Sequence, residues 1–217
     1  MTETPRRGHL FVVAAPSGTG KTSLVRAAMA ARPQLGFSVS YTTRPIRATE
    51  VDGRDYHFVD RSAFEHMVAA GELLEWARVF DNYYGTGLAV VRAALERGES
   101  LILEIDWQGA RQVRTRLPEA VQVFILPPSR AELERRLRGR GTDAAAVIER
   151  RLRDSVTELS HWDEFDYVVV NDVFEQALAA LLRVVDGAGT AAADDLRVDR
   201  PGLAAFAAGL LQSRPAT

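Results

Sequence analysis

The segment Ala15-Pro16-Ser17-Gly18-Thr19-Gly20-Lys21-Thr22 decides the fold of this chain. The apolar run Leu10–Ala14 precedes it, and the helical pattern Ser23–Ala31 follows it. A strand, a glycine loop, Lys-Thr and a helix in this order cradle nucleotide phosphates, because backbone N–H groups and the helix N-terminus face the anion. Lys21 is expected to reach the outer phosphates, and Thr22 to offer its hydroxyl to Mg²⁺. The segment therefore predicts that the chain binds a nucleoside triphosphate.

Two details of this loop bear on the prediction. Of the 27 Lys and Arg residues in the chain, only Lys21 is a lysine, so a compact and flexible ammonium was kept at this position alone. The pattern G-x-x-x-x-G-K-[ST] has Ala15 in place of its first glycine, and alanine would be strained there at positive φ. We expect the loop to tolerate Ala15, because Gly18 and Gly20 remain where it wraps the phosphates.

Composition and charge narrow the class of protein. With 217 residues and 47% hydrophobic content, the chain fits one domain with appendages. A formal net charge of −2 argues against a nucleic-acid binder that relies on bulk electrostatics. The chain has no cysteine, which excludes disulfides and thiolate metal sites and fits a reducing compartment. The short polar N-terminus predicts neither a signal peptide nor a membrane helix, so we expect a soluble cytoplasmic protein.

Strand and helix patterns alternate through most of the chain. Four nearly continuous apolar runs are typical of strands buried on both faces of a parallel sheet, namely Leu10–Ala14, Leu101–Ile105, Val121–Leu126 and Tyr167–Val170. The helical patterns are Ser23–Ala31, Leu88–Arg97, Arg111–Arg116, Ala131–Leu137, Ala144–Leu159 and Glu175–Val185. This alternation predicts a doubly wound α/β core, a parallel sheet flanked by helices. Ligands of such sheets bind beyond the carboxyl ends of the strands.

The region from Phe37 to Thr86 breaks this alternation. Val39–Thr43 and Tyr56–Val59 have the pattern of short half-polar strands, with a turn at Asp52-Gly53 between them. We interpret the region as an inserted subdomain that lies outside the parallel sheet.

The C-terminal tail, from about Asp186, is rich in Ala, Gly and Asp. A weak amphipathic helix is expected at Leu203–Leu211, and it either packs on the core or stays mobile. The chain shows no internal repeat.

Several polar motifs lie in and after the inserted region. They are Ser40-Tyr41-Thr42-Thr43-Arg44-Pro45-Ile46-Arg47, Gly53-Arg54-Asp55-Tyr56, Glu72-Leu73-Leu74-Glu75-Trp76 and Asn82-Tyr83-Tyr84-Gly85-Thr86. Together with the phosphate loop, their order and spacing resemble those of the guanylate kinases, the enzymes that phosphorylate GMP with ATP. The resemblance covers the chain from about residue 9 to residue 185. The phosphate loop alone predicts only a phosphate binder.

Arg44 and Arg47, three residues apart in a loop that Pro45 restrains, can contact one phosphate through charge-assisted hydrogen bonds. Tyr56 and Tyr84 can donate their hydroxyls to the same group. In the family these positions hold the nucleoside monophosphate, so the resemblance implies that role here. The alternative is a pair of solvated arginines and two half-buried tyrosines.

Glu75 lies in the apolar setting Leu73-Leu74-Glu75-Trp76, where a carboxylate needs hydrogen-bond donors. Guanine offers two donors on one edge, N1–H and the 2-amino group, and the hydroxyls of Ser40 and Thr86 could donate to its O6. Adenine has an acceptor at N1 and no 2-amino group, so AMP would leave Glu75 unpaired. These residues are therefore expected to select GMP. The alternative is a surface glutamate beside a core tryptophan.

Glu104 and Asp106 follow the apolar part of the strand expected at Leu101–Ile105. Period-two spacing predicts that both carboxylates lie on one side of the strand end, facing the phosphate loop if the two strands are neighbours. Asp106 is placed either to hold the Mg²⁺ shell with Thr22 or to orient Arg44. Glu104 stands where family members often carry aspartate, and the resemblance implies a guanine or ribose contact there.

The resemblance also concerns the second half of the chain. Residues 135–143 and 149–152 resemble the mobile lid of the family, in which Arg140 and Arg151 match arginines that neutralise charge on the transferring phosphoryl group. Asn171 matches a family position near the ATP adenine and the phosphate loop. The other arginines of this stretch are expected to form a solvated basic face, and they are Arg135, Arg136, Arg138, Arg150 and Arg153.

The resemblance implies a cytoplasmic guanylate kinase that transfers the γ-phosphoryl group of ATP to GMP, giving ADP and GDP, a step in GTP and dGTP supply and in GMP recycling. The expected catalytic residues are Lys21, Arg44, Arg140 and Arg151. The expected ATP-binding residues are Ala15, Pro16, Ser17, Gly18, Thr19, Gly20, Lys21, Thr22 and Asn171. The expected GMP-binding residues are Ser40, Arg44, Arg47, Tyr56, Glu75, Tyr84, Thr86, Glu104 and Asp106. Thr22 and Asp106 are expected to serve Mg²⁺, partly through water.

The expected organisation is a kinase-like domain at 8–186 and a tail at 187–217. Within the domain we expect a core (8–36 and 88–186), a GMP-binding insert (37–87) and a lid at about 138–153. The expected partners are ATP, GMP and dGMP, with neither nucleic acid nor membrane, and a homo-oligomer is compatible with the sequence.

Two other functions stay open. One is a catalytically inactive scaffold of guanylate-kinase-like fold that binds phosphorylated peptides, and the intact phosphate loop argues against it. The other is a kinase for AMP or a pyrimidine nucleotide, which Ser40, Glu75 and Thr86 disfavour.

Overall fold

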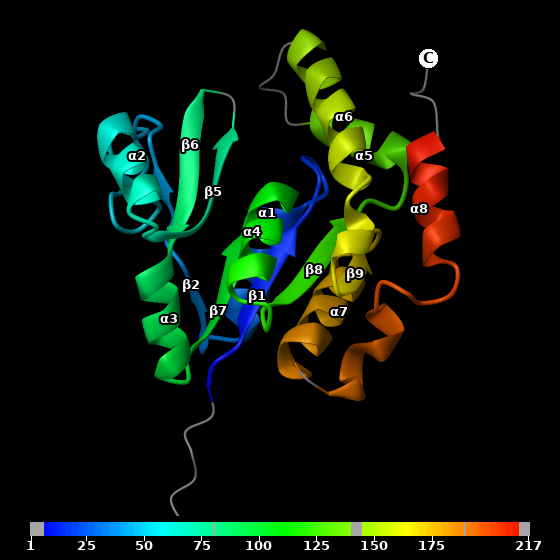
Figure 1. Ribbon diagram of the computed structural model, residues 1–217. Helices are drawn as coiled ribbons and strands as arrows, with labels where there is room; N and C mark the ends of the chain where they lie inside the picture. Colours follow the sequence, from blue (N-terminus) through cyan, green and yellow to red (C-terminus); the bar gives the residue numbers. More distant parts are fainter. Residues whose placement is uncertain (1–6, 80, 140–144, 189, 213–217) are drawn as a thin grey trace, which may run out of the picture. The chain divides into compact units, whose positions relative to one another are not determined.

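The computed structural model describes residues 7–79, 81–139, 145–188 and 190–212, and Figure 1 shows their helices and strands. These residues form two compact units. The first unit consists of the described residues up to Phe11 together with Pro33–Ala120, and the second of Val12–Arg32 together with the described residues from Val121 onward. Strand β1, Leu10–Ala14, begins in the first unit and ends in the second.

Five strands form a sheet in the order β2-β7-β1-β8-β9. In the first unit, β2 (Leu35–Phe37) pairs in parallel with β7 (Ser100–Glu104). In the second unit, β8 (Val121–Leu126) pairs in parallel with β9 (Tyr167–Val170). Every residue of β1 is buried, as expected for a strand covered on both faces. The predicted α/β class is therefore confirmed; β1, β8 and β9 have the predicted bounds, and β7 lies one residue earlier than predicted.

Helices α1 and α7 of the second unit lie beside its strands (Figure 1). Up to residue 186, the helices of this unit are α1 (Lys21–Ala31), α5 (Arg130–Arg138), α6 (Ala145–Leu159), the short 3₁₀ helix η1 (Trp162–Glu164) and α7 (Phe174–Asp186). The sequence pattern predicts all of them except η1. The largest difference is at the start of α1, which begins at Lys21 rather than Ser23, so Lys21 and Thr22 belong to its first turn.

In the first unit, α3 (Leu88–Glu96) agrees with the pattern, whereas α4 (Trp107–Arg116) begins four residues earlier than predicted. The reason is a capping hydrogen bond: Asp106 Oδ1 accepts the Gly109 N–H at 2.8 Å. An aspartate in this position satisfies a backbone donor that the first helical turn leaves unpaired.

A second sheet occupies the region that departs from the alternation. It has the order β4-β3-β6-β5 and consists of β3 (Tyr41–Thr42), β4 (His57–Phe58), β5 (Leu73–Val79) and β6 (Asn82–Gly87). β3 and β4 lie within the two predicted strands but are shorter, and because they pair in parallel the turn between them is not a hairpin. The pattern places Phe37 in this region, whereas Phe37 is the last residue of β2 in the parallel sheet.

Three elements of this region escape the sequence pattern, namely β5, β6 and helix α2 (Arg61–Ala69). Asp60 caps α2 by accepting the Ala63 N–H at 2.7 Å, and Phe64 is the one buried residue of the helix. A helix with a single buried side chain leaves too weak a hydrophobic period to be recognised.

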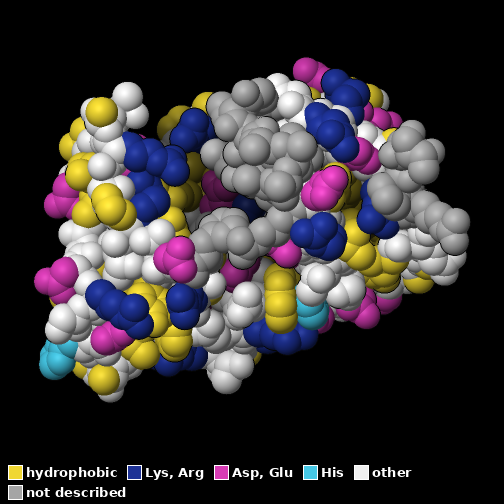
Figure 2. Space-filling view, turned by 90° about the horizontal axis from the view of Figure 1, so that it is seen from above, with side chains coloured by type: hydrophobic (Ala, Val, Ile, Leu, Met, Phe, Trp, Pro, Cys, Tyr) yellow, Lys and Arg dark blue, Asp and Glu magenta, His cyan; other side chains and the backbone are white. Residues whose placement is uncertain are grey.

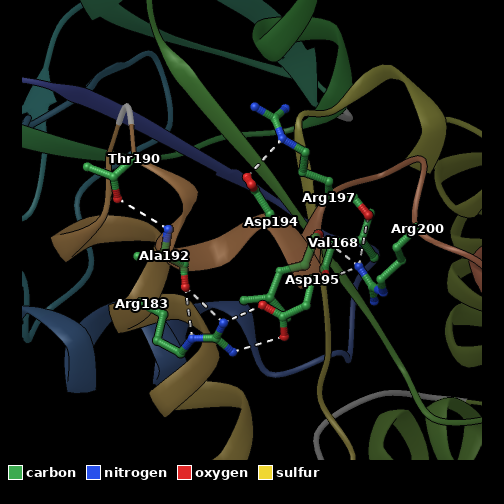
Figure 3. A network of polar contacts seen from close by, with 9 residues as sticks. Val168, Arg183, Thr190, Ala192, Asp194, Asp195, Arg197 and Arg200 are labelled. Carbon is green, nitrogen blue, oxygen red and sulfur yellow. Dashed lines mark hydrogen bonds and ion pairs between the residues drawn. The ribbon is translucent and has the colours of Figure 1, made fainter.

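The described tail covers an edge of the parallel sheet. β9 is the last strand of that sheet, and Arg197 forms an antiparallel bridge with Tyr167 beside it. The Val198 N–H donates to the Asp166 carbonyl oxygen at 3.0 Å. The Arg200 guanidinium donates to the Val168 carbonyl oxygen at 2.8 Å (Figure 3). The tail thus pairs an edge strand whose backbone groups would otherwise be exposed.

Two helical segments continue this packing, a 3₁₀ helix η2 (Ala191–Leu196) and helix α8 (Leu203–Gln212). Arg183 of α7 pairs with Asp195 of η2 and donates to the Ala192 carbonyl oxygen at 2.8 Å (Figure 3). α8 contacts α6 and buries three apolar side chains, Leu203, Ala207 and Leu210. The weak helix predicted at Leu203–Leu211 therefore exists and packs within the second unit.

Charged side chains of both signs share the surface. On the face drawn in Figure 2, arginine side chains lie among acidic ones. Ion pairs between exposed side chains include Arg61–Glu65 and Arg97–Glu99, each with an N–O distance of 2.8 Å. No helix in the described part of the chain combines the length and the apolar character that a membrane crossing demands.

Candidate active site

The phosphate loop lies in the second unit, between the end of β1 and the start of α1. Gly18 and Gly20 both have a φ of 91°, a left-handed conformation that favours glycine. A Cβ on Gly20 would lie 2.7 Å from the Asn171 Nδ2, so this position also has no space for a side chain. Gly20 is the N-cap residue of α1, and no side-chain hydrogen bond caps this end of the helix. Because the first N–H groups of a helix have no intrahelical acceptor, this end of α1 suits an anion.

One side chain that follows β9 and one from α5 hold this loop by its backbone. Asn171, directly after β9, donates from Nδ2 to the Thr19 carbonyl oxygen at 2.6 Å. Arg136 of α5 donates from Nη1 to the same oxygen at 3.4 Å. Thr19 is buried, and its Oγ1 donates to the Pro16 carbonyl oxygen at 2.8 Å. The structure therefore brings Asn171 to the loop, and it removes Arg136 from the solvated face on which it was expected.

Arg44 lies at the centre of a polar cluster in the first unit. Its Nη2 donates to Glu50 Oε1 at 2.7 Å, and both side chains are mostly buried. The guanidinium lies 5.5 Å from the ring centroid of Tyr56, whose ring meets that of Tyr84 edge-on at 6.0 Å. Glu50 raises the pKa of Arg44 most, and a side-chain hydrogen bond with Tyr84 adds to this. One cation and two phenols thus converge, as the binding of a phosphate requires.

Glu50 is a residue of this cluster that the sequence analysis missed. Its Oε2 accepts the Arg47 N–H at 2.9 Å, and its own N–H donates to the Arg47 carbonyl oxygen at 3.0 Å. The hydrogen bond from Arg44, followed by that from the Arg47 backbone, lowers the pKa of Glu50, so its carboxylate is charged at neutral pH. An acidic residue three and six positions after two arginines is a local signal that could have identified it.

Arg47 and Ser40 differ from the cluster in their surroundings. The Arg47 side chain is exposed, and it is the backbone of Arg47 that contacts Glu50. Ser40 is half-buried just before β3, where its carbonyl oxygen accepts the His57 N–H at 2.9 Å.

Glu75 and Thr86 form a second polar centre in the first unit. They face each other across the antiparallel pair β5–β6, and Thr86 Oγ1 donates to Glu75 Oε1 at 2.6 Å. Glu75 is 4% exposed, and its burial raises the pKa of its carboxyl to about 7, although the Thr86 hydrogen bond acts in the opposite direction. The charge of Asp106 raises this pKa further. A buried carboxyl with one hydroxyl donor is well suited to bind a ligand edge that carries two N–H donors.

Glu104 and Asp106 lie in different local settings. β7 ends at Glu104, so Asp106 is outside the strand and the period-two argument does not apply to it. The charge of Asp106 raises the pKa of Glu75. The pKa of Tyr56 is raised most by burial, then by Tyr84, and then by the charge of Glu104. The two carboxylates therefore serve different centres, Asp106 beside Glu75 and Glu104 beside the Arg44 cluster.

The arginines of α5 form ion pairs along their own helix. Arg135 and Arg136 both pair with Glu132 at 2.6 Å, and Arg138 pairs with Glu134 at 2.7 Å. Arg135 and Arg138 are largely exposed, as expected of a solvated face. The side chains of the two predicted lid arginines lie outside the described part of the chain. Arg140 lies outside the described residues, and Arg151 belongs to α6 with its side chain outside the described part.

Oxygen donors for a divalent cation exist in each unit. Thr22 is exposed in the first turn of α1, and Asp106 uses one carboxylate oxygen to cap α4. Among the residues that the structure describes, no three His, Asp or Glu side chains are grouped closely enough to hold a metal. Mg²⁺ usually keeps several waters and binds one or two carboxylates together with substrate phosphates, so a Mg²⁺ ion does not need an all-protein cage.

Comparisons with known proteins agree with one another. A family model described as guanylate kinase matches residues 7–188. The guanylate kinase of Chromohalobacter salexigens is 56% identical over 179 residues, which cover 82% of this chain and 83% of that protein. The guanylate kinase of Methylococcus capsulatus is also 56% identical, over 82% of this chain and 88% of that protein. The crystal structure of guanylate kinase from Anaplasma phagocytophilum matches 83% of this chain and 86% of that one with a TM-score of 0.66 and 35% identity.

Proposed function

The chain belongs to the guanylate kinase family, and from this premise we propose which of its residues carry the reaction. It is an ATP:GMP phosphotransferase, which transfers the γ-phosphoryl group of ATP to GMP and gives ADP and GDP. The observation that carries the assignment of residues is the presence of two separate anion sites, a glycine loop at the start of α1 and the Arg44 cluster. A donor and an acceptor nucleotide need one each.

ATP is assigned to the loop from Ala15 to Thr22. The positive φ of Gly18 and Gly20, and the start of α1, which no side chain caps, support the binding of phosphates through backbone N–H groups. Lys21 is proposed to contact the β- and γ-phosphates, where negative charge builds during transfer. Asn171 contributes by holding the loop through Thr19.

The phosphate of GMP is assigned to Arg44, Tyr56 and Tyr84, with Arg47 as an exposed second arginine. The Arg44–Glu50 ion pair supports this role, because it fixes the guanidinium before the ligand arrives. The attacking group is a phosphate oxygen that is already anionic near neutral pH, so the reaction needs no general base and depends on positioning and electrostatics.

The guanine base is assigned to Glu75, with Thr86, Ser40 and Asp106, whereas Glu104, beside the Arg44 cluster, is proposed to contact another part of GMP. Thr86 already donates to one oxygen of Glu75, and the N1–H and 2-amino groups of guanine would supply further donors. AMP offers no such pair, so its binding would leave a buried carboxylate unsatisfied, which discriminates by factors of about 10⁴ in favourable cases.

Members of this family need a divalent cation. We propose Mg²⁺, with Thr22 and Asp106 as its protein residues, acting partly through water. When bound, the cation neutralises phosphate charge. By resemblance to the family we also assign catalytic roles to Arg140 and Arg151. We propose that the kinase-like domain at 8–186 has three parts, namely a core, a GMP-binding insert at 37–87 and a lid near 138–153.

Several finer points are part of the same proposal. dGMP should be accepted as well, because the contacts assigned here involve the base and the phosphate. We infer a cytoplasmic location, where a chain without cysteine suits the reducing conditions. Light scattering of the purified protein would show whether it is a monomer or a homo-oligomer.

A turnover assay with matched substrates tests the proposal. ADP formation from ATP and Mg²⁺ should depend on GMP and dGMP, and should stay near background with AMP, CMP and dTMP. Omitting the metal is the control for the cation. Comparable rates with AMP would contradict the base-reading role of Glu75, and the absence of GMP-dependent turnover would contradict the function itself.

A further inference from the structure

Two side chains of α6 hold Ser17, the third residue of the phosphate loop, by both of its backbone polar groups. The Ser17 N–H donates to Glu158 Oε2 at 3.0 Å, and Ser155 Oγ donates to the Ser17 carbonyl oxygen at 3.4 Å. All three residues belong to the second unit. We propose that Glu158 and Ser155 are positioning residues, which fix the phosphate loop in the conformation that binds ATP.

The helix is anchored where these contacts occur. Ser155 and Glu158 are three residues apart, so they lie on the same side of α6. Ser155 is fully buried, and the apolar side chains of Leu152 and Leu159, one turn before and one turn after it, are buried as well. A rigid helix can therefore transmit a fixed geometry to Ser17, which a flexible loop could not do.

The loop needs such external support. Several N–H dipoles of a phosphate loop point toward one centre, and in the absence of an anion they repel one another. The structure supplies outward contacts at Ser17 from α6 and at Thr19 from Asn171. Backbone N–H donors that are already oriented when ATP arrives require no reorganisation of the loop. They therefore favour both ATP binding and phosphoryl transfer.

The charge of Glu158 makes the assignment testable. A carboxylate beside an anion site opposes the binding of phosphate through electrostatic repulsion. Its hydrogen bond to the Ser17 N–H offsets that repulsion if the bond orients the loop. If Glu158 instead merely competes with ATP for this N–H, its removal would strengthen ATP binding, so the two roles predict effects of opposite sign.

The experiment compares Glu158→Ala, Glu158→Gln and Ser155→Ala with Thr157→Ala, an exposed position on the same helix. For Glu158→Ala we expect KM for ATP to rise about tenfold, the size expected from losing a hydrogen bond to a charged group, while KM for GMP changes less than about twofold. Glu158→Gln keeps an oxygen that accepts the Ser17 N–H, so it should stay within about threefold of the wild type. Ser155→Ala should have a smaller effect than Glu158→Ala, because its bond is longer.

A second readout does not depend on turnover. Exchange of the Ser17 amide hydrogen, followed by NMR without nucleotide, should become faster in Glu158→Ala and remain slow in Glu158→Gln and Thr157→Ala. The proposal rests on ATP as the ligand of the loop, and calorimetric titration with ATP tests binding even if GMP is not phosphorylated. A wild type without GMP-dependent turnover would therefore refute the proposed function and leave this inference to be judged on binding and exchange.

Two results would overturn the inference. One is a Glu158→Ala protein whose ATP affinity and Ser17 exchange match those of Thr157→Ala. The other is tighter ATP binding by both Glu158 variants, which would identify the carboxylate as a competitor of the phosphates. If Glu158→Ala does not fold, an ATP affinity of Ser155→Ala equal to that of Thr157→Ala, together with tighter ATP binding by Glu158→Gln, would have the same consequence.

Discussion

Glu75→Gln is expected to stabilise the protein at alkaline pH and to impair its use of GMP. In the folded chain, burial raises the pKa of Glu75 from 4.5 to about 7, against the effect of the Thr86 hydrogen bond. An acid whose pKa is higher in the folded state contributes stability that is fully present below pH 4.5 and is lost as the pH rises through about 7. This difference in pKa corresponds to roughly 3 kcal/mol of stability that the wild type lacks at pH 8.

Glutamine removes the charge and keeps an oxygen that accepts the Thr86 hydroxyl. At pH 8 the variant should be more stable than the wild type by up to roughly 3 kcal/mol, or about 6–12 °C in Tm for a chain of this size. At pH 5 the gain should be less than about 1 kcal/mol, because the folded wild type then carries a protonated Glu75. Urea unfolding at the two pH values measures both free energies.

The same substitution should impair the use of GMP, although it stabilises the protein. kcat/KM for GMP should fall about 10- to 150-fold, the range for a hydrogen bond to a charged group, while KM for ATP is unchanged. In the wild type KM for GMP should rise as the pH falls below about 7, and this dependence should disappear in the variant. Glu72→Gln, an exposed glutamate three residues earlier, is the matched control. A stability gain that is independent of pH, or normal GMP use by Glu75→Gln, would refute the reasoning.

Three further predictions concern other parts of the chain. Lys21→Ala should lower kcat by about 10²-fold or more while Tm changes little, and near-normal turnover in the GMP assay would exclude its catalytic role. Gly20→Ala should destabilise the protein more than Gly202→Ala. Both residues have positive φ (91° and 81°), but only a Cβ at Gly20 meets another side chain. Equal losses of stability on urea unfolding would contradict this prediction. Arg200→Met should lower the free energy of unfolding by about 1–3 kcal/mol, because it leaves backbone carbonyl groups unpaired. Arg26→Met, at an exposed position, should not lower it. Equal stabilities of the two variants would show that the tail does not depend on Arg200.

Much of the fold and the types of residue in the candidate site follow from short stretches of sequence. The phosphate loop is recognisable because its glycines, Lys21 and Thr22 are contiguous and lie between a strand and a helix. Strands such as β1 and β8 are predictable because continuous apolar runs can be satisfied only by burial on both faces. Helices with a strong apolar period, such as α7, are equally predictable. α2 and β6 were missed because they are short and half-polar.

The sequence by itself determined which chemical groups this chain possesses and which local elements carry them. Only the tertiary structure decided what each group contacts. Glu75 has its high pKa because folding buries its carboxyl and brings the charge of Asp106, 31 positions further along the chain, close to it, while the hydrogen bond from Thr86 acts in the opposite direction. Ser17 meets Glu158 across 141 positions of sequence. Such contacts depend on strand register and helix packing, which are settled by burial over the whole unit, and no local propensity encodes them.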